Sequence, residues 1–200
     1  LHLSVHSFPT RRSSDLVFQK LLGGRGVAAK YYYEEIGPEV DPFDEENKII
    51  LMSGPLTGLP LPATTKFQLS TKSPETGGYL CSNCSGRVGT HLKRCGFDGM
   101  IIEGKADAWT YLKIVDGEVE FCDAADLAGK ETGEVLPLLY EAAGTEKAGA
   151  LTVGPAAENL VRISYVCVDT RAFGRGGAGA VFGSKNLKGL IVRGTGEVPA

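Results

Sequence analysis

Two pairs of short stretches in this sequence are alike, and this internal repeat constrains the fold more than any other feature. The stretch 51–55, Leu-Met-Ser-Gly-Pro, returns at 151–155 as Leu-Thr-Val-Gly-Pro. The stretch 99–104, Gly-Met-Ile-Ile-Glu-Gly, returns at 189–194 as Gly-Leu-Ile-Val-Arg-Gly. Chance likeness of short apolar strands is the alternative, but the shared order favours a duplicated unit of strand, strand, loop, helix and strand.

Local patterns predict short elements around this repeat. Apolar and alternating runs predict strands at 48–52, 66–71, 100–103, 109–115, 118–121, 150–153, 162–168 and 190–193. Helices are predicted at 27–36, 88–95 and 132–143. The apolar face of the first helix is expected to consist of Ala28, Ala29, Tyr32 and Tyr33. A hairpin turn is expected at Asp116-Gly117. We therefore predict an α+β fold of duplicated β-rich halves with short helices, at about 17–105 and 106–195.

The first sixteen residues do not fit this pattern. The string 6–16 resembles translated sequencing-adaptor DNA, and Arg11-Arg12 is not followed by the apolar stretch of an export signal. We expect residues 1–16 to be a non-native leader and residues 17–200 to be one domain. Because the chain has no initiator methionine and stops in mid-flow after Ala200, we expect it to be a fragment that lacks C-terminal domains.

Composition narrows the classes of partner. The net charge is -3 and the pI about 5.7, which argues against a nucleic-acid binder with a broad basic face. No apolar run is long enough to cross a bilayer, so no membrane partner is expected. The five cysteines lack the even spacing of a disulfide framework, which favours a reducing, cytoplasmic location.

The stretch 171–179, Arg-Ala-Phe-Gly-Arg-Gly-Gly-Ala-Gly, is the strongest candidate site. Glycines let backbone N–H groups approach a ligand, and arginines bind phosphate through two parallel hydrogen bonds. The stretch 174–179 also satisfies G-x-G-x-x-G, but a dinucleotide site would follow its strand directly and want an acidic residue where Arg193 ends the next strand. A non-catalytic phosphate- or nucleotide-binding module remains the alternative function.

Other chemistry-bearing residues have simpler interpretations. Cys81 and Cys84 form a single C-x-x-C with no second copy, so packing beside a ligand loop is favoured over metal ligation, with a redox role left open. His91 is expected to be a surface or hydrogen-bonding residue. The sequence has no Ser/His/Asp signature and no H-E-x-x-H motif, so no catalytic residue is assigned.

Several ordered motifs together resemble a known family. They are 22–26 (Leu-Gly-Gly-Arg-Gly), 54–58 (Gly-Pro-Leu-Thr-Gly), 71–74 (Thr-Lys-Ser-Pro), 92–106, 154–161 and 174–188. In this order they resemble the N-terminal domain of the aldehyde ferredoxin oxidoreductase family, over about residues 17–195.

The resemblance implies a platform of two similar halves beneath a bis-pterin cofactor, tungstopterin, in which two dithiolenes hold tungsten or molybdenum. It implies a Mg ion that links the two pterin phosphates. It further implies a [4Fe–4S] cluster, with ligands in the C-terminal domains, that passes electrons from an aldehyde to ferredoxin as the aldehyde becomes a carboxylic acid. The metal and cluster would carry the chemistry, so this chain alone is expected to be inactive. A homodimer is left open.

The resemblance also assigns site residues. Lys66 stands where the family often has an arginine that contacts the cofactor. The first cofactor loop is matched at Asn83, and Ser85 replaces a glycine beside the pterin. Asn83 would offer its backbone carbonyl to Mg. In the second cofactor loop the matching residues are Arg171, Ala172, Gly174 and Arg175, with the backbone carbonyl of Ala172 as the other Mg ligand.

Overall fold

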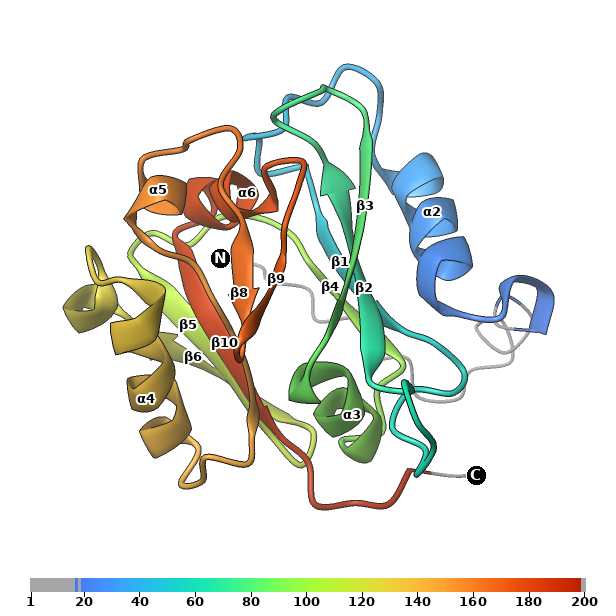
Figure 1. Cartoon of the computed structure of the whole chain (residues 1–200). Coiled ribbons are helices and arrows are strands. Elements are labelled where there is room, and N and C mark those ends of the chain that lie inside the picture. The colour runs from blue at the N-terminus through green and yellow to red at the C-terminus, as the bar shows by residue number, and fades with distance from the viewer. Residues whose placement is uncertain (1–16, 18, 199–200) are drawn as a thin grey trace.

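The first of two β-sheets has the strand order β3-β2-β1-β4, and all its pairings are antiparallel (Figure 1). The computed structural model describes residues 17 and 19–198. The strands of this sheet are β1 (Ile49–Ser53), β2 (Lys66–Lys72), β3 (Tyr79–Ser85) and β4 (Gly99–Ile102). Helix α2 (Gly24–Glu35) packs on β1 and β2, and α3 (Arg87–Arg94) connects β3 to β4.

The second sheet has the order β6-β5-β10-β7-β8-β9, in which β5 runs parallel to β10. Its strands are β5 (Thr110–Val115), β6 (Glu118–Asp123), β7 (Gly149–Thr152), β8 (Val166–Val168), β9 (Arg171–Phe173) and β10 (Leu187–Arg193). Its helices are the 3-10 helix η1 (Ala125–Leu127), α4 (Thr132–Ala142), α5 (Pro155–Glu158) and α6 (Ala178–Ser184). Figure 1 shows α4 on the outer face of this sheet and α2 on the far side of the first sheet.

The internal repeat is visible in the topology, which confirms the predicted duplicated α+β fold. Strands β3-β2-β1-β4 of the first sheet correspond in order to β9-β8-β7-β10 of the second. The registers match as well: Leu51 pairs with Met100 between β1 and β4, and Leu151 pairs with Leu190 between β7 and β10. A short helix, α3 or α6, precedes the last strand of each unit. The hairpin β5–β6 is an addition to the second unit.

The main hydrophobic core lies between the two sheets and draws on both. Leu51, Leu69 and Leu92 from the first unit pack in one cluster with Leu151 and Leu190 from the second. Helix α3 contacts β1, β7 and β10, so it lies between the sheets. Each leucine here is fully buried, and such burial stabilises by about 1.5–3 kcal/mol per side chain. The shared core holds the two units in a fixed relation.

Most predicted elements are confirmed, with two corrections. Tyr33 is 88% exposed and does not belong to the buried face of α2, which rests on Val27 and Ala28. The predicted strand 162–168 is reduced to β8, because Ser164 turns back: its N–H bonds to Val161 O and its carbonyl accepts from Gly179 N.

Two predictions lie beyond these observations. The predicted leader, residues 1–16, lies outside the described residues, and the limits of the two halves stay predictions. No helix in the described chain is long and apolar enough to cross a membrane.

Candidate functional site

The edge strands β3 and β9, one from each sheet, lie side by side. Asn83, predicted to lie in a loop, is instead near the middle of β3, and Ala172 is the central residue of β9. Both are exposed, while their strand neighbours Cys84 and Phe173 point into the core, as alternation along a strand requires. Phe173 stacks edge-on against Phe67 with ring centroids 5.0 Å apart, which fixes β9 on the first sheet.

Asn83 and Ala172 occupy equivalent positions in the two units. Across the first sheet, Met52 pairs with Gln68, and Gln68 pairs with Asn83. Across the second sheet, Thr152 pairs with Cys167, and Cys167 pairs with Ala172. The internal repeat therefore places the two residues that the resemblance assigns to Mg at matching positions in the two sheets.

One end of the β3–β9 junction brings together three predicted site residues. Lys66 pairs directly with Ser85 across β2 and β3. Ser85 and Arg171 line one pocket of about 400 Å³. Burial raises the pKa of the Cys84 thiol, and the nearby Arg171 opposes part of that rise. Lys66, Ser85 and Arg171 thus meet where β3 ends and β9 begins.

The other end of the junction carries the glycine-rich loop with Arg175. Here Ser73 Oγ donates to Gly176 O at 2.8 Å, and Gly176 N donates to Glu75 Oε2 at 3.0 Å. These bonds fix the loop to the turn that precedes β3. Arg171 and Arg175 therefore flank the Asn83–Ala172 pair from opposite ends, and the structure does not place Arg175 in the pocket with Arg171.

The glycines of this loop divide into two kinds, which refines the expectation that all of them admit a ligand. Gly176 has φ +88°, and a Cβ there would meet Leu80 Cδ1 at 2.2 Å. Gly177 has φ +77°, and a Cβ would meet Arg162 O at 2.0 Å. At both positions, close contact with Leu80 or Arg162 leaves no room for a side chain, so these glycines serve the packing of the loop. Gly174 alone of the three faces open space, with nothing within 4 Å of its Cβ position.

The charges of the site suit a ligand with two phosphates. Lys66, Arg171 and Arg175 are exposed, and none of these side chains has a hydrogen bond or ion pair with any residue that the structure describes. Free arginine forks on an exposed strand edge are the groups that bind phosphate oxygens pairwise. Together with the open space at Gly174, this arrangement fits the phosphate ends of a bis-pterin cofactor.

Asp169, which sequence reasoning missed, links the β8–β9 turn to α3, α4 and β7. It lies in the β8–β9 turn with φ 49° and is 8% exposed. Its Oδ2 accepts from Arg87 N at 2.9 Å, and its Oδ1 accepts from Tyr140 OH at 2.8 Å and Ala150 N at 3.1 Å. Burial and the hydrogen bond to Asp169 raise the pKa of Tyr140 to about 12. The signal in the sequence was an aspartate between two strands, at a turn position.

The family is decided by sequence comparison. The sequence model described as "Aldehyde ferredoxin oxidoreductase, N-terminal domain" matches residues 1–194. The chain belongs to the aldehyde ferredoxin oxidoreductase family. It is similar to the tungsten-containing aldehyde ferredoxin oxidoreductase of Pyrococcus furiosus, with 40% identity over 200 residues, or all of this chain and 33% of that protein. The protein of the same name from Pyrococcus abyssi is 46% identical over 177 residues, or 88% of this chain and 29% of that protein.

A solved structure shows the same fold. The active-site complex BamBC of benzoyl coenzyme A reductase, in complex with 1,5-dienoyl-CoA, superposes with a TM-score of 0.89 at 34% identity. The match covers 92% of this chain and 28% of that chain. This chain thus spans about a third, or less, of the relatives that it matches, and corresponds to the N-terminal domain of the aldehyde ferredoxin oxidoreductase family.

The cysteine pair of this family member is split by the fold. Cys81 and Cys84 are three residues apart on β3, so their side chains lie on opposite faces of the strand. Cys84 is buried in the core, where packing is its visible role. Within residues 17 and 19–198, no three His, Cys, Asp or Glu side chains gather as a metal site.

His91 is a buried hydrogen-bonding residue. Gly194 N donates to His91 Nδ1 at 3.0 Å, so Nε2 carries the proton and donates to Lys147 O at 2.8 Å. These hydrogen bonds fix the orientation of the ring. It connects α3 to the turn before β7 and to the end of β10.

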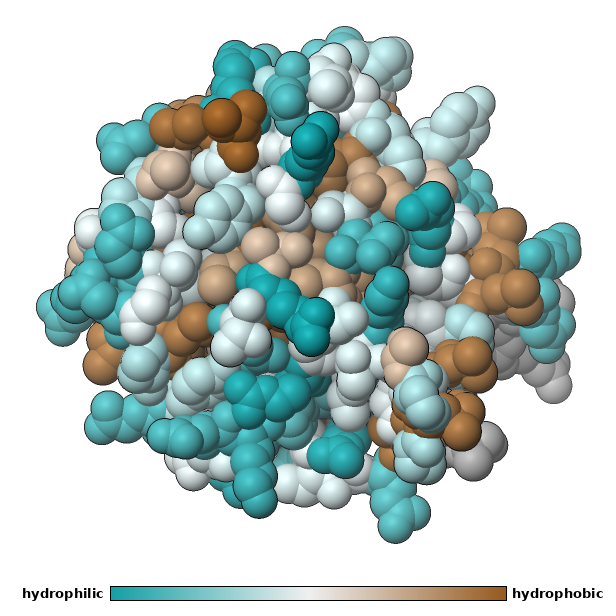
Figure 2. Space-filling view, viewed as in Figure 1, coloured by the Kyte–Doolittle hydropathy of each residue, from teal (hydrophilic) through white to brown (hydrophobic). Residues whose placement is uncertain are grey.

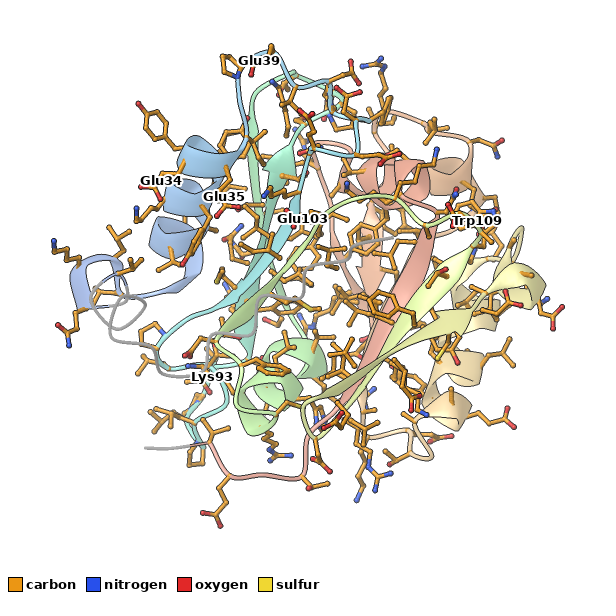
Figure 3. All side chains as sticks on the ribbon, turned by 180° about the vertical axis from the view of Figure 1, so that it is seen from behind. Glu34, Glu35, Glu39, Lys93, Glu103 and Trp109 are labelled. Carbon is orange, nitrogen blue, oxygen red and sulfur yellow. The ribbon has the colours of Figure 1, made fainter. Side chains whose placement is uncertain are left out.

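An acidic pocket of about 400 Å³ opens elsewhere on the domain, lined by Glu35, Glu45, Glu46, Lys48, Glu103 and Gly104. Figure 3 shows Glu35 on α2 and Glu103 after β4 on the face opposite that of Figure 1. Lys48 Nζ bonds to Glu35 Oε2 at 2.8 Å and to Glu103 Oε2 at 2.6 Å. None of the residues that line this acidic pocket lines the pocket of Ser85 and Arg171.

Proposed function

We propose that this chain is the N-terminal cofactor-binding domain of a tungsten- or molybdenum-dependent oxidoreductase. The complete protein would oxidise aldehydes to carboxylic acids with water and pass the electrons through a [4Fe–4S] cluster to ferredoxin. The observation that carries the proposal is the equivalence of Asn83 and Ala172 in the two units, flanked by free cations at both ends. A cofactor built of two similar halves with two phosphates matches this symmetry.

The residues of the domain would divide the work of binding. Lys66 and Arg171 would hold one phosphate, and Arg175 would hold the other. The backbone carbonyls of Asn83 and Ala172 would hold the Mg ion of the cofactor. When bound, the metal of the cofactor supplies the two-electron chemistry, and the domain orients it and excludes water beneath it.

Lys66 and Ser85 are the two departures from the family pattern, and they are neighbours in the structure. They face each other across β2 and β3, so both changes fall on one end of the site. Lysine binds phosphate as a point charge and leaves more freedom than an arginine fork. The Ser85 side chain fills space that a glycine would leave open. We propose that the pterin half at this end is held differently from the half near Arg175.

The remaining features of the proposal come from the resemblance and from cysteine usage. The five cysteines are unbridged, which suits a reducing cytoplasm. The [4Fe–4S] ligands would lie in C-terminal domains, together with any catalytic acid or base.

The test is cofactor content rather than activity alone. The complete protein would be produced anaerobically with tungstate or molybdate, and metal and pterin would be measured per chain. We expect two pterins and one metal atom. Arg175→Ala should lower pterin content at least about tenfold, since a charge-assisted pair contributes about 1.5–3 kcal/mol, while the thermal midpoint changes little. The matched control is Lys105→Ala, because Lys105 is an exposed cation that lies outside β3, β9 and the glycine-rich loop.

A protein without metal or pterin under these conditions would contradict the proposal. The non-catalytic phosphate-binding module would then be the better description. Full pterin occupancy in Arg175→Ala would instead show that Arg175 does not bind the cofactor. The proposal that the domain binds a bis-pterin cofactor would still stand.

A further inference from the structure

The pocket that contains Ser85 and Arg171 extends well beyond these two residues. It is also lined by Arg87 and Arg94 of α3 and by Lys147 of the turn before β7. No carboxylate of the described chain lines it. Figure 2 shows hydrophilic residues gathered below the centre of the face drawn there. Four cationic side chains thus converge on one cavity of about 400 Å³, although the chain as a whole has a net charge of -3.

Three of these cations have no counterion among residues 17 and 19–198. The side chains of Arg94, Lys147 and Arg171 form neither a hydrogen bond nor an ion pair within the described part of the chain. Arg87 differs, because its Nη2 donates to Tyr140 OH at 2.9 Å and lies 3.3 Å from Asp169 Oδ1. Its guanidinium also lies over the Tyr140 ring at 5.1 Å from the centroid. The Arg87 side chain is therefore held in place by contacts within the protein, whereas the side chains of Arg94, Lys147 and Arg171 are available to bind an anion.

Two further residues of α3, Thr90 and His91, line the cavity. His91 Nε2 donates to the carbonyl of Lys147, which holds that turn against α3. Thr90 lines the cavity, and its Oγ1 is buried without a hydrogen-bond partner among the described residues. That oxygen has no accessible surface, so a ligand in the cavity does not reach it, and Thr90 contributes only packed surface to the lining.

We propose that this cavity binds the phosphate group of a small phosphorylated ligand. Arg94 and Arg171 can each offer a planar pair of N–H donors, and Lys147 can add a point charge. The volume lies at the low end of small-molecule sites, which leaves room for a phosphate and a small organic part. The phosphate can come from the proposed cofactor, because Ser85 and Arg171 belong to both sites, or from a free phosphorylated metabolite.

The direct test is the binding of inorganic phosphate to the complete protein, measured by calorimetry. Protein made without tungstate and molybdate, and freed of pterin, should bind one phosphate per chain with a Kd of about 1 mM or tighter. In the Arg94→Gln/Lys147→Gln variant the affinity should fall on the order of 100-fold, because each charge-assisted contact is worth about tenfold or more. Lys105→Gln removes one exposed cation and should bind phosphate like the wild type. Thermal midpoints of all three proteins confirm that they fold.

Cofactor loading identifies the source of the phosphate. If the pterin cofactor occupies the cavity, loaded protein binds no inorganic phosphate, and the double variant loses pterin. If a free metabolite occupies it, loaded protein still binds phosphate, and the double variant keeps its pterin. The proposal is overturned if the folded double variant binds phosphate as tightly as the wild type, or if Lys105→Gln weakens binding equally. A failure of cofactor loading would leave the phosphate measurement unaffected.

Discussion

Asp169→Asn should loosen the connection between the β8–β9 hairpin and α3 without removing a large side chain. The Asp169 carboxylate accepts from two backbone N–H groups, from Tyr140 OH and from the Arg87 guanidinium, and it is 8% exposed. Asparagine has one acceptor oxygen, so its NH₂ group must face either Arg87 N on one side or the Tyr140 and Ala150 donors on the other. A buried donor left without an acceptor costs about 1–3 kcal/mol.

The magnitude follows from counting these contacts. One orphaned N–H, together with the lost charge beside Arg87, gives a destabilisation of about 2–4 kcal/mol. The loss of stability should be largest in the β8–β9 turn and in the first turn of α3. The assay is hydrogen exchange of the peptide segments around 86–88 and 168–171, in which protection should fall by about 30-fold or more, at 1.4 kcal/mol per tenfold.

The control is Asp126→Asn, because Asp126 is exposed in η1 and its carboxylate has no hydrogen bond to a described residue. Its exchange pattern should match that of the wild type. If Asp169→Asn also exchanges like the wild type in both segments, then Asp169 does not couple the two units and the reasoning is refuted.

The other predictions concern the glycine loop and a buried lysine. Gly176→Ala should destabilise by about 1–3 kcal/mol, since its φ is +88° and its Cβ would meet Leu80, whereas Gly174→Ala should leave the urea midpoint unchanged but reduce pterin content. Burial lowers the pKa of Lys185 from 10.5 to about 8, so the unfolded state binds more protons between these values, and unfolding free energy should rise with pH there by at most about 1.4 kcal/mol per pH unit. Urea unfolding from pH 8 to 9.5 measures this; a rise that persists in Lys185→Met has another cause.

The repeat was readable from the sequence because each unit uses its own local signals. Apolar strands followed by Gly-Pro, and an apolar run that follows Gly99 or Gly189, mark the same positions in both units. The hairpin at Asp116-Gly117 was also local, and both residues have the positive φ that its turn requires. These elements need no knowledge of distant contacts.

The cationic pocket of Arg94, Lys147 and Arg171 could not be predicted from the sequence in this way. Arg94 and Lys147 are 53 residues apart and belong to different units, and only the packing of α3 between the sheets brings them to one cavity. Gly176 and Gly174 look alike in the sequence, yet one is required by Leu80 and the other faces open space. Tyr33 matched a helical spacing but is exposed, whereas the buried face of α2 consists of Ala28, which was predicted, and Val27, which was not. Each of these outcomes depends on tertiary contacts.

The candidate site combines a backbone that repeats in the two units with charged side chains that do not repeat. The repeat places Asn83 and Ala172 at equivalent points, so the backbone offers a ligand two matched surfaces. The side chains do not repeat: Lys66 and Arg171 share one end with a cationic pocket, while the other end has Arg175 on a loop anchored by Ser73. A ligand with two identical halves would therefore be bound more strongly through its phosphate at the pocket end. Removing cations there should therefore lower pterin content more than Arg175→Ala does.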